Sequence, residues 1–301
     1  MNVDKNELLE EIKSHLKINI RIIGIPPQGM DSQVFTIADE NNKEYIVKVT
    51  KYINPESEIY VLLEEKKVNI PYPKVLANFE YNGGTVLILE KISKPLLDSV
   101  PVEDMAPYIS SMIEVMRELH KVKSDIPGKP VNQVSGSTWK TELLSTFEGD
   151  LIDWKDVYKR ELLDGDLVKT SVEKFIERTN QMTFLDRDFS LLHTDFNQRN
   201  LFVDTSTKKI GGIIDWSGAI FGDPIYDFAR IRMYIWHFDL GQESIKEYYE
   251  LMDYTDNQKK LDDYYWLFRV IEYLAWYSEE ENEFNLGRIK LHQDFLRNYQ
   301  W

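Results

Sequence analysis

Two short apolar runs, each followed by an acidic residue on a predicted loop, constrain this chain more than any other feature of its sequence. Residues 191–202 read Leu-Leu-His-Thr-Asp-Phe-Asn-Gln-Arg-Asn-Leu-Phe, and residues 213–216 read Ile-Ile-Asp-Trp. Apolar runs of this length are typical of buried strands, so the polar residues between them fall on loops. A hairpin would hold these loops together and bring Asp195, Asn200 and Asp215 to one region of the fold.

Two carboxylates and a carboxamide in this order have a definite chemistry. The carboxylate of Asp195 can orient a hydroxyl or accept its proton, and the side-chain oxygens of Asn200 and Asp215 suit a hard cation such as Mg²⁺. Each residue alone also fits a helix cap or a turn. The combined spacing, His-x-Asp-x-x-x-x-Asn, a hairpin and then Asp, is far more specific. It predicts a site that activates a hydroxyl beside a nucleotide and Mg²⁺.

The composition excludes several other classes of protein. The 301 residues include no cysteine, so disulfides and thiolate metal sites are impossible and a reducing compartment is expected. The first residues lack the basic and apolar regions of a signal peptide. No apolar run approaches the ~18 residues that a membrane span needs. We expect a cytoplasmic protein with no membrane partner.

The formal net charge of −15 bears on the partners of the chain. Nucleic acids and anionic membranes require a basic footprint, so neither is expected as a partner. An acidic field suits a cationic small molecule. Because acidic surfaces also keep many cytosolic proteins soluble, the charge alone leaves both interpretations open.

The order of the predicted elements divides the chain into two lobes. Residues up to about 92 show strand and turn patterns, with one helix over about 4–16 and another from Asn54 to about Lys67. Strands are predicted over residues 18–25, 33–38, 44–50 and 85–90. After the connector 91–95, helical periodicity dominates to the end of the chain. The predicted class is α+β, with a small antiparallel β lobe over 1–92 that ends in a hinge and a mainly helical lobe over 93–301.

Lys48 is the second candidate for chemistry, because it interrupts an apolar strand. It could be an exposed alternating residue, but its position would be explained if its ammonium reached nucleotide phosphates. Such a lysine needs a carboxylate, and Glu58 on the next helix is preferred over Glu56, which lies nearer the helix start. The preceding loop offers Gly29 for close backbone approach and Ser32 for phosphate contact. That loop is not a Walker A sequence and could also be an ordinary turn.

Together these residues resemble the protein-kinase-like small-molecule phosphotransferases, the aminoglycoside and macrolide phosphotransferase family. The similarity covers nearly the whole chain in the family's order, from the glycine loop and Lys48 to the two acidic loops. Segments 137–139, 214–217 and 221–223 are similar to the hygromycin phosphotransferase branch. The resemblance implies a two-lobed protein-kinase-like fold.

The resemblance also implies a role for each central residue. Asp195 would be the catalytic base or orienter that faces the acceptor hydroxyl. Asn200 and Asp215 would hold Mg²⁺. Lys48 would contact the phosphates of ATP or GTP and pair with Glu58. The sequence does not distinguish between the two nucleotides.

Further residues receive supporting roles from the resemblance. Backbone groups at Glu90 and Ile92 would bind the edge of the nucleobase. His193 and Asp227 would brace the catalytic loop rather than react. Trp216 stands where protein kinases have Phe-Gly, and no long activation segment follows it. The acceptor is therefore expected to be a small molecule and not a protein.

The C-terminal helices are expected to determine the acceptor. Their aromatic residues concentrate in segments 234–238 and 264–277, where core packing is the favoured explanation for most of them. Acidic residues such as Glu272 and Glu279 lie among them. Carboxylates over a cleft would bind the ammonium groups of an aminoglycoside, whereas an apolar cleft would suit a macrolide. The sequence leaves both open.

The predicted function is transfer of the γ-phosphoryl group of ATP or GTP to a hydroxyl of an aminoglycoside-type antibiotic. Alternatives are a macrolide kinase and a metabolic kinase that acts on choline, homoserine or a sugar derivative. A non-catalytic nucleotide-binding module would be expected to lack Lys48, Asp195, Asn200 or Asp215, yet all four are present. We expect a cationic, hydroxyl-bearing substrate, Mg²⁺ as cofactor, and a monomer or weak dimer.

Overall fold

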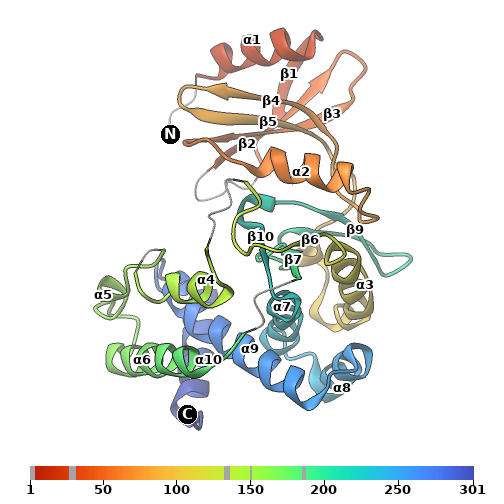
Figure 1. The fold of residues 1–301 in the computed structure, drawn as a ribbon. Coiled ribbons are helices and arrows are strands. Elements are labelled where there is room, and N and C mark those ends of the chain that lie inside the picture. Colours follow the sequence, from red (N-terminus) through yellow and green to blue (C-terminus); the bar gives the residue numbers. More distant parts are fainter. Residues whose placement is uncertain (1–3, 27–31, 132–135, 150, 185–187) are drawn as a thin grey trace. The chain divides into compact units, whose positions relative to one another are not determined.

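A computed structural model describes residues 4–26, 32–131, 136–149, 151–184 and 188–301. The chain divides into two compact units, which are drawn in Figure 1. Unit 1 comprises residues 1–100 and 198–219, and unit 2 comprises residues 101–197 and 220–301. Unit 1 therefore takes a second segment from the middle of the chain.

Unit 1 is built on a five-stranded antiparallel sheet with the strand order β1-β2-β3-β5-β4. Its strands are β1 (Ile20–Gly24), β2 (Ser32–Asp39), β3 (Glu44–Thr50), β4 (Val75–Tyr81) and β5 (Gly84–Glu90). Four of them match the predicted strands. β4 was not predicted, although its alternating burial is the period-two signal of a half-buried strand.

Two helices flank this sheet, α1 (Lys5–Leu16) and α2 (Glu56–Glu65). The Asp4 side chain accepts hydrogen bonds from the first amides of α1, which fixes its start. Leu8 and Ile12 of α1 are buried in one apolar cluster with residues from all five strands. The helix therefore covers one face of the sheet, as Figure 1 shows.

A hairpin from the middle of the chain completes unit 1. It consists of β8 (Leu201–Asp204), β9 (Lys209–Ile213) and the 3₁₀ turn η4 (Trp216–Gly218). The connector lies against it, since the Val203 amide donates to the Pro95 carbonyl at 2.9 Å. A Cβ at Gly212 would lie 2.5 Å from Ile92 Cδ1, so the connector packs closely against the hairpin at this glycine. These contacts extend the compact unit past the proposed lobe boundary at residue 92, to Val100.

Unit 2 combines helices with a small three-stranded sheet of order β10-β7-β6. The strands are β6 (Lys123–Ser124), β7 (Phe189–Leu192) and β10 (Ile220–Gly222). The α-helices are α3 (Ile109–Leu119), α4 (Trp139–Ser145), α5 (Trp154–Val157), α6 (Gly165–Gln181), α7 (Pro224–His237), α8 (Gly241–Met252), α9 (Asp256–Tyr277) and α10 (Glu283–Asn298). The 3₁₀ turns are η1 (Leu97–Ser99) in unit 1 and η2 (Val102–Asp104) and η3 (Ala106–Tyr108) in unit 2.

Aromatic side chains form much of the core of unit 2. The rings of Trp139, Tyr226 and Tyr265 pack edge to face, and Phe268 packs on Tyr226. A Cβ at Gly222 would lie 2.3 Å from the Trp139 ring, so β10 also packs closely here. Core packing is thereby confirmed for Tyr265 and Phe268, which belong to the predicted aromatic segments. Trp276 differs, since it is 43% exposed.

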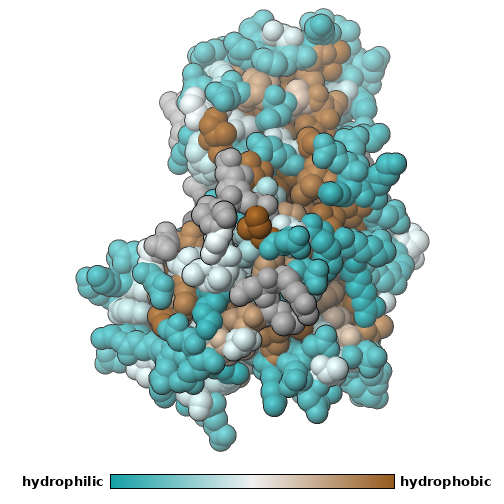
Figure 2. Space-filling model, viewed as in Figure 1, coloured by the Kyte–Doolittle hydropathy of each residue, from teal (hydrophilic) through white to brown (hydrophobic). Residues whose placement is uncertain are grey.

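The exposed surfaces fit an acidic, polar protein. Hydrophilic side chains cover much of the face of unit 2 that Figure 2 shows. Among the described residues, no helix has the length and apolar character to cross a bilayer.

Candidate functional site

Lys48 lies at the centre of a polar cluster in unit 1. Its Nζ is 2.7 Å from Glu56 Oε2 and 2.7 Å from Asp215 Oδ1. The lysine side chain is 15% exposed, and Glu56 is buried. Desolvation opposes the charged form, but the two carboxylates outweigh it and raise the pKa of Lys48. The ammonium is therefore fixed as a cation.

The prediction that Glu58 pairs with Lys48 is wrong, because Glu56 takes that place. Glu58 is exposed on the other side of α2. Successive helical residues rotate by about 100° around the axis, so two glutamates at i and i+2 point in nearly opposite directions. The start of the helix decides which of them meets the sheet.

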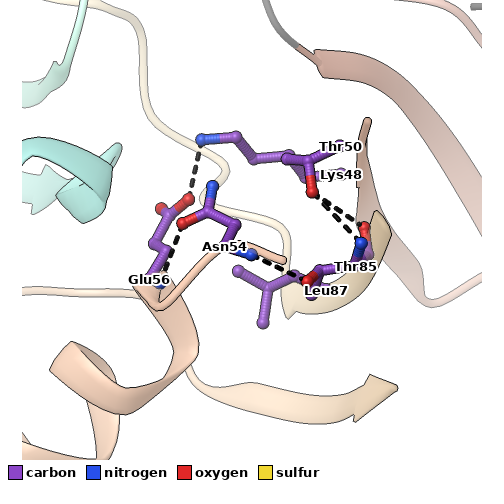
Figure 3. A pocket seen from close by; sticks show the side chains of 6 residues that line it. All are labelled: Lys48, Thr50, Asn54, Glu56, Thr85 and Leu87. Atoms are coloured by element: carbon purple, nitrogen blue, oxygen red, sulfur yellow. Dashed lines mark hydrogen bonds and ion pairs between the residues drawn. The ribbon is translucent and has the colours of Figure 1, made fainter. Parts of the chain in front are cut away.

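Asn54 fixes that start, as Figure 3 shows. Its backbone amide donates to Thr85 Oγ1 on β5 at 2.9 Å, and its side-chain Oδ1 accepts from the backbone amide of Glu56 at 2.9 Å. These residues line a small hollow together with Thr50 and Leu87. The hollow has no room for a water molecule, so it is not a ligand pocket of the usual ~300–1,000 Å³. The hollow belongs to the support of Lys48 and Glu56.

Glu56 also connects this cluster to the loop that bears Asp215. Its Oε1 accepts from the Trp216 amide at 3.2 Å and from the Tyr60 hydroxyl at 3.4 Å. Asp215 itself has φ +66°, in the left-handed region that side chains other than Gly, Asn and Asp rarely adopt. One buried glutamate therefore positions both the lysine and the strained turn.

Asn200 and Asp215 lie just outside the first residue pair of the β8–β9 hairpin. Leu201 pairs with Ile213, and the Ile214 amide donates to the Asn200 carbonyl at 3.1 Å. Asp215 is 38% exposed and accepts from Ser217 Oγ at 3.0 Å. The hairpin thus holds the backbones of both residues close together, as the sequence predicts.

This donor set fits a magnesium ion. Lys48 contributes one positive charge against the two negative charges of Glu56 and Asp215, which leaves a net charge of −1. Among the residues that the structure describes, no three His, Cys, Asp or Glu side chains form a complete metal site. Mg²⁺ usually takes only one or two carboxylates and completes its shell with phosphate and water oxygens. One carboxylate and one carboxamide therefore suffice.

The loop with Asp195 belongs to unit 2. The Asp195 side chain is 44% exposed, and its Oδ1 accepts from Asn197 Nδ2 at 2.8 Å. Arg230 Nη2 of α7 lies 3.5 Å from the same oxygen. The carboxylate is thus accessible, and both of these contacts reach Oδ1.

Asp227 holds the backbone of this loop. Its carboxylate is buried and accepts from the His193 amide at 2.8 Å and the Thr194 amide at 2.9 Å. His120 Nε2 lies 3.3 Å from it. Burial raises the pKa of the Asp227 carboxyl, but the hydrogen bonds and His120 lower it further, so the net shift is downward. The His193 ring is buried, and its Nδ1 accepts from the Asp195 amide at 3.3 Å.

Arg269 of α9 holds the same loop from the carbonyl side. Its Nη2 donates to the Thr194 carbonyl at 3.2 Å, and its Nη1 donates to Glu272 at 2.6 Å. Its guanidinium lies 4.0 Å from the centre of the Tyr226 ring. Thr194 has φ +63°, an uncommon conformation for a β-branched residue. Hydrogen bonds on both of its peptide groups offset that strain.

The remaining predicted residues have simpler surroundings. Ser32 begins β2, and Gly29 lies outside the described residues. Glu90 ends β5, and its amide donates to the Lys74 carbonyl at 2.9 Å. Ile92 follows in the connector and contacts the hairpin at Gly212. Their nucleotide contacts stay predictions.

Sequence reasoning missed Asn54, Arg230 and Arg269. Arg230 has a usable signal, because it lies three residues after Asp227 and so on the same helical face. Arg269 lies in an apolar stretch of a predicted helix, where a charged residue needs a partner. Asn54 has no such signal beyond its place before a helix.

Comparisons with known proteins show the family of this chain. A family model described as the phosphotransferase enzyme family, APH, matches residues 23–264. The chain therefore belongs to this family. The hygromycin-B 4-O-kinase of Escherichia coli is 23% identical over 215 residues, which are 68% of this chain. The chain spans 60% of the length of that relative.

Solved structures show the same fold. A thermostable mutant of aminoglycoside phosphotransferase APH(4)-Ia, in a ternary complex with AMP-PNP and hygromycin B, has a TM-score of 0.73 at 16% identity, covering 97% of this chain and 96% of that one. Spectinomycin phosphotransferase APH(9)-Ia, in complex with ADP and spectinomycin, has a TM-score of 0.65 at 15% identity, covering 99% of each chain. The predicted kinase-like α+β fold is confirmed.

Proposed function

We propose that this protein transfers the γ-phosphoryl group of ATP or GTP to a hydroxyl of an aminoglycoside-type antibiotic. The observation that supports this most strongly is the contact of Lys48 with both Glu56 and Asp215, in a chain of the phosphotransferase family. A strand lysine that two carboxylates hold ionised is suited to polyphosphate oxygens.

The residues of unit 1 would bind the nucleotide. Lys48 would exchange its contact with Asp215 for phosphate oxygens and keep Glu56. Asn200 and Asp215 would hold Mg²⁺, which would supply positive charge to neutralise the phosphates. Glu90 and Ile92 would offer backbone groups to the nucleobase, and Ser32 would contact phosphate.

Asp195 would act on the acceptor. Its exposed carboxylate would accept a hydrogen bond from the acceptor hydroxyl and turn the oxygen lone pair toward the γ-phosphorus. The new oxygen–phosphorus bond forms as the bridging bond to the β-phosphate breaks, and the hydroxyl proton passes to Asp195. The products are a phosphate ester and the nucleoside diphosphate.

The net charge of −15 supports a cationic acceptor, because a negative field attracts polyamines. A macrolide, which carries fewer amino groups than an aminoglycoside, would gain less from this field. Solved structures with hygromycin B and with spectinomycin bound have the same fold as this chain, which agrees with an aminoglycoside acceptor. At 16% and 15% identity, the similarity concerns the fold and not the binding residues.

The test is nucleoside diphosphate release from ATP and GTP with hygromycin B, other aminoglycosides, a macrolide, choline, homoserine and simple sugars. We expect turnover with at least one aminoglycoside. Turnover only with a macrolide or a metabolite would refute the acceptor class and keep the reaction. No acceptor-dependent turnover with any of them would refute the reaction.

The matched variant is Asp195→Asn, which keeps the size of the side chain. Loss of a general base lowers kcat by roughly 10²–10⁴-fold, while nucleotide affinity should stay near that of the unmodified protein. Full activity of Asp195→Asn would refute the assigned mechanism.

A further inference from the structure

Arg230 on α7 is a buried cation beside the proposed catalytic residue. It is 8% exposed, and its Nη2 lies 3.5 Å from Asp195 Oδ1. Its Nη1 contacts the hydroxyl of Tyr273, whose ring centre lies 5.1 Å from the guanidinium carbon. Its Nε is buried with no hydrogen-bond partner among the described residues.

The counter-charge of Arg230 distinguishes it from the neighbouring arginine. Arg269 pairs at 2.6 Å with Glu272, which is 14% exposed, so that charge is compensated within the core. In the described part of the chain, the carboxylate paired with Arg230 is Asp195. Burial and the charge of Arg269 lower the pKa of Arg230. Asp195 and, at longer range, Glu272 favour its charged form, but the direct ion pair is with Asp195. Losing that pair should therefore be costly for a buried cation.

Two donors meet at one oxygen of Asp195. Asn197 Nδ2 lies 2.8 Å and Arg230 Nη2 lies 3.5 Å from Oδ1. Asn197 belongs to the same loop, whereas Arg230 belongs to a helix whose Asp227 already holds the loop backbone. One face of α7 therefore contacts both the backbone and the carboxylate of this loop.

We propose that Arg230 is a positioning residue, which holds the Asp195 carboxylate in the orientation that the acceptor hydroxyl requires. Its activity test rests on the proposed phosphotransferase function, but its unfolding test does not. A contact that fixes the orienting group should affect kcat more than substrate binding, because misplacing such a group slows the chemical step.

Arg232 offers a matched control two residues along the same helix. It pairs with the buried Asp262 at 2.9 Å and with Asp263 at 2.5 Å. These partners lie on α9, and they are not part of the Asp195 loop. Arg230 and Arg232 therefore share helix, residue type and ion pairing but differ in their contact with Asp195.

The activity test compares the full-length chain with Arg230→Gln, Arg230→Lys and Arg232→Gln. We expect Arg230→Gln to lower kcat by roughly 10–100-fold with KM for the nucleotide changed by less than about threefold. Arg230→Lys should recover part of the loss, since it restores the charge but not the planar fork. Folded Arg232→Gln should keep kcat within about threefold. A kcat for Arg230→Gln near that of the unmodified protein, or an equal loss in Arg232→Gln, would overturn the proposal.

The unfolding test is a double-mutant cycle of Arg230→Gln and Asp195→Asn, measured by thermal denaturation without substrate. Each single change should lower Tm by roughly 2 °C or more, and the double variant should lose clearly less than the sum, because each change removes the same pair. Additive losses, or a higher Tm for Asp195→Asn alone, would overturn the pair. This result stands even where acceptor screening refutes the phosphotransferase reaction.

Discussion

Asp215 of unit 1 and Asp195 of unit 2 are similar side chains in opposite electrostatic surroundings. Both are partly exposed, at 38% and 44%, and both lie on loops with a left-handed residue. Asp215 shares one lysine with the buried Glu56, so carboxylates are in excess. Asp195 pairs with Arg230, and Arg269 donates to the carbonyl of the preceding loop residue, Thr194.

The difference indicates a different task for each acid. An excess of negative charge around Asp215 favours a divalent cation, which would complete the charge balance. A carboxylate whose charge an arginine already compensates has less need of a metal and can contact a hydroxyl instead. The surroundings, and not the residue type, separate the two proposed roles.

The sharpest test of this contrast is Asp215→Asn beside Asp195→Asn. Both should lower kcat by roughly 10²–10⁴-fold, but only Asp215→Asn should weaken the dependence of nucleotide affinity on Mg²⁺. Calorimetric titration of a non-hydrolysable nucleotide with and without Mg²⁺ measures this. Equal nucleotide affinities for the two variants at every Mg²⁺ concentration would remove the distinction.

Acid should affect unit 2 before unit 1. His292 Nε2 lies 2.8 Å from His237 Nε2, and burial lowers the pKa of His292 to about 4 and that of His237 well below its usual value. Histidines of the unfolded chain bind protons below about pH 6.5, so the unfolded state is favoured as pH falls from there toward 4. The loss is about 1.4 kcal/mol per pH unit for each such histidine at most.

Thermal denaturation of the unmodified chain and of His292→Gln between pH 7.5 and 5 checks this expectation. The Tm of the unmodified chain should fall more steeply with acid than that of the variant. The only histidine of unit 1 is His15, so we expect unit 2 to unfold first as the pH falls. All tryptophans except Trp216 lie in unit 2, so tryptophan fluorescence should report that first change. Equal slopes for the two proteins would contradict the prediction.

The smallest effect concerns the two glutamates of α2. Glu56→Gln removes a buried charge from Lys48 and weakens the acceptor of the Trp216 amide, which should cost about 1–3 kcal/mol of unfolding free energy and lower kcat. Glu58→Gln, two residues away and exposed, should stay within about 0.5 kcal/mol. Urea denaturation and turnover of both variants measure the contrast. The reverse order of the two losses would restore Glu58 as the partner.

The same pair of glutamates shows where sequence reasoning reaches its limit. Both are acidic, both lie in the first turn of a correctly predicted helix, and only the helix phase separates them. That phase depends on the hydrogen bond from Asn54 to Thr85, which joins residues 31 positions apart. Local patterns predict a helix and a carboxylate but not this contact.

Other parts of the molecule could be predicted from the sequence because they depend on local residue patterns. The β8–β9 hairpin follows from two apolar runs, and it holds the backbones of Asn200 and Asp215 close together. Lys48 interrupts a strand that does form. The arginines beside the Asp195 loop come from helices 35 and 74 residues later, and their approach depends on tertiary packing.

The insertion of residues 101–197 between the two segments of unit 1 has a consequence for protein synthesis. Lys48 and Glu56 leave the ribosome early, but Asp215 follows Val100 by more than a hundred residues. At roughly 5–20 residues per second, several seconds or more pass between synthesis of the five-stranded sheet and synthesis of the hairpin that completes unit 1. During that interval Lys48 can pair with Glu56 but not with Asp215. The ribosome must synthesise residues 101–197 of unit 2 before the second segment of unit 1 is available.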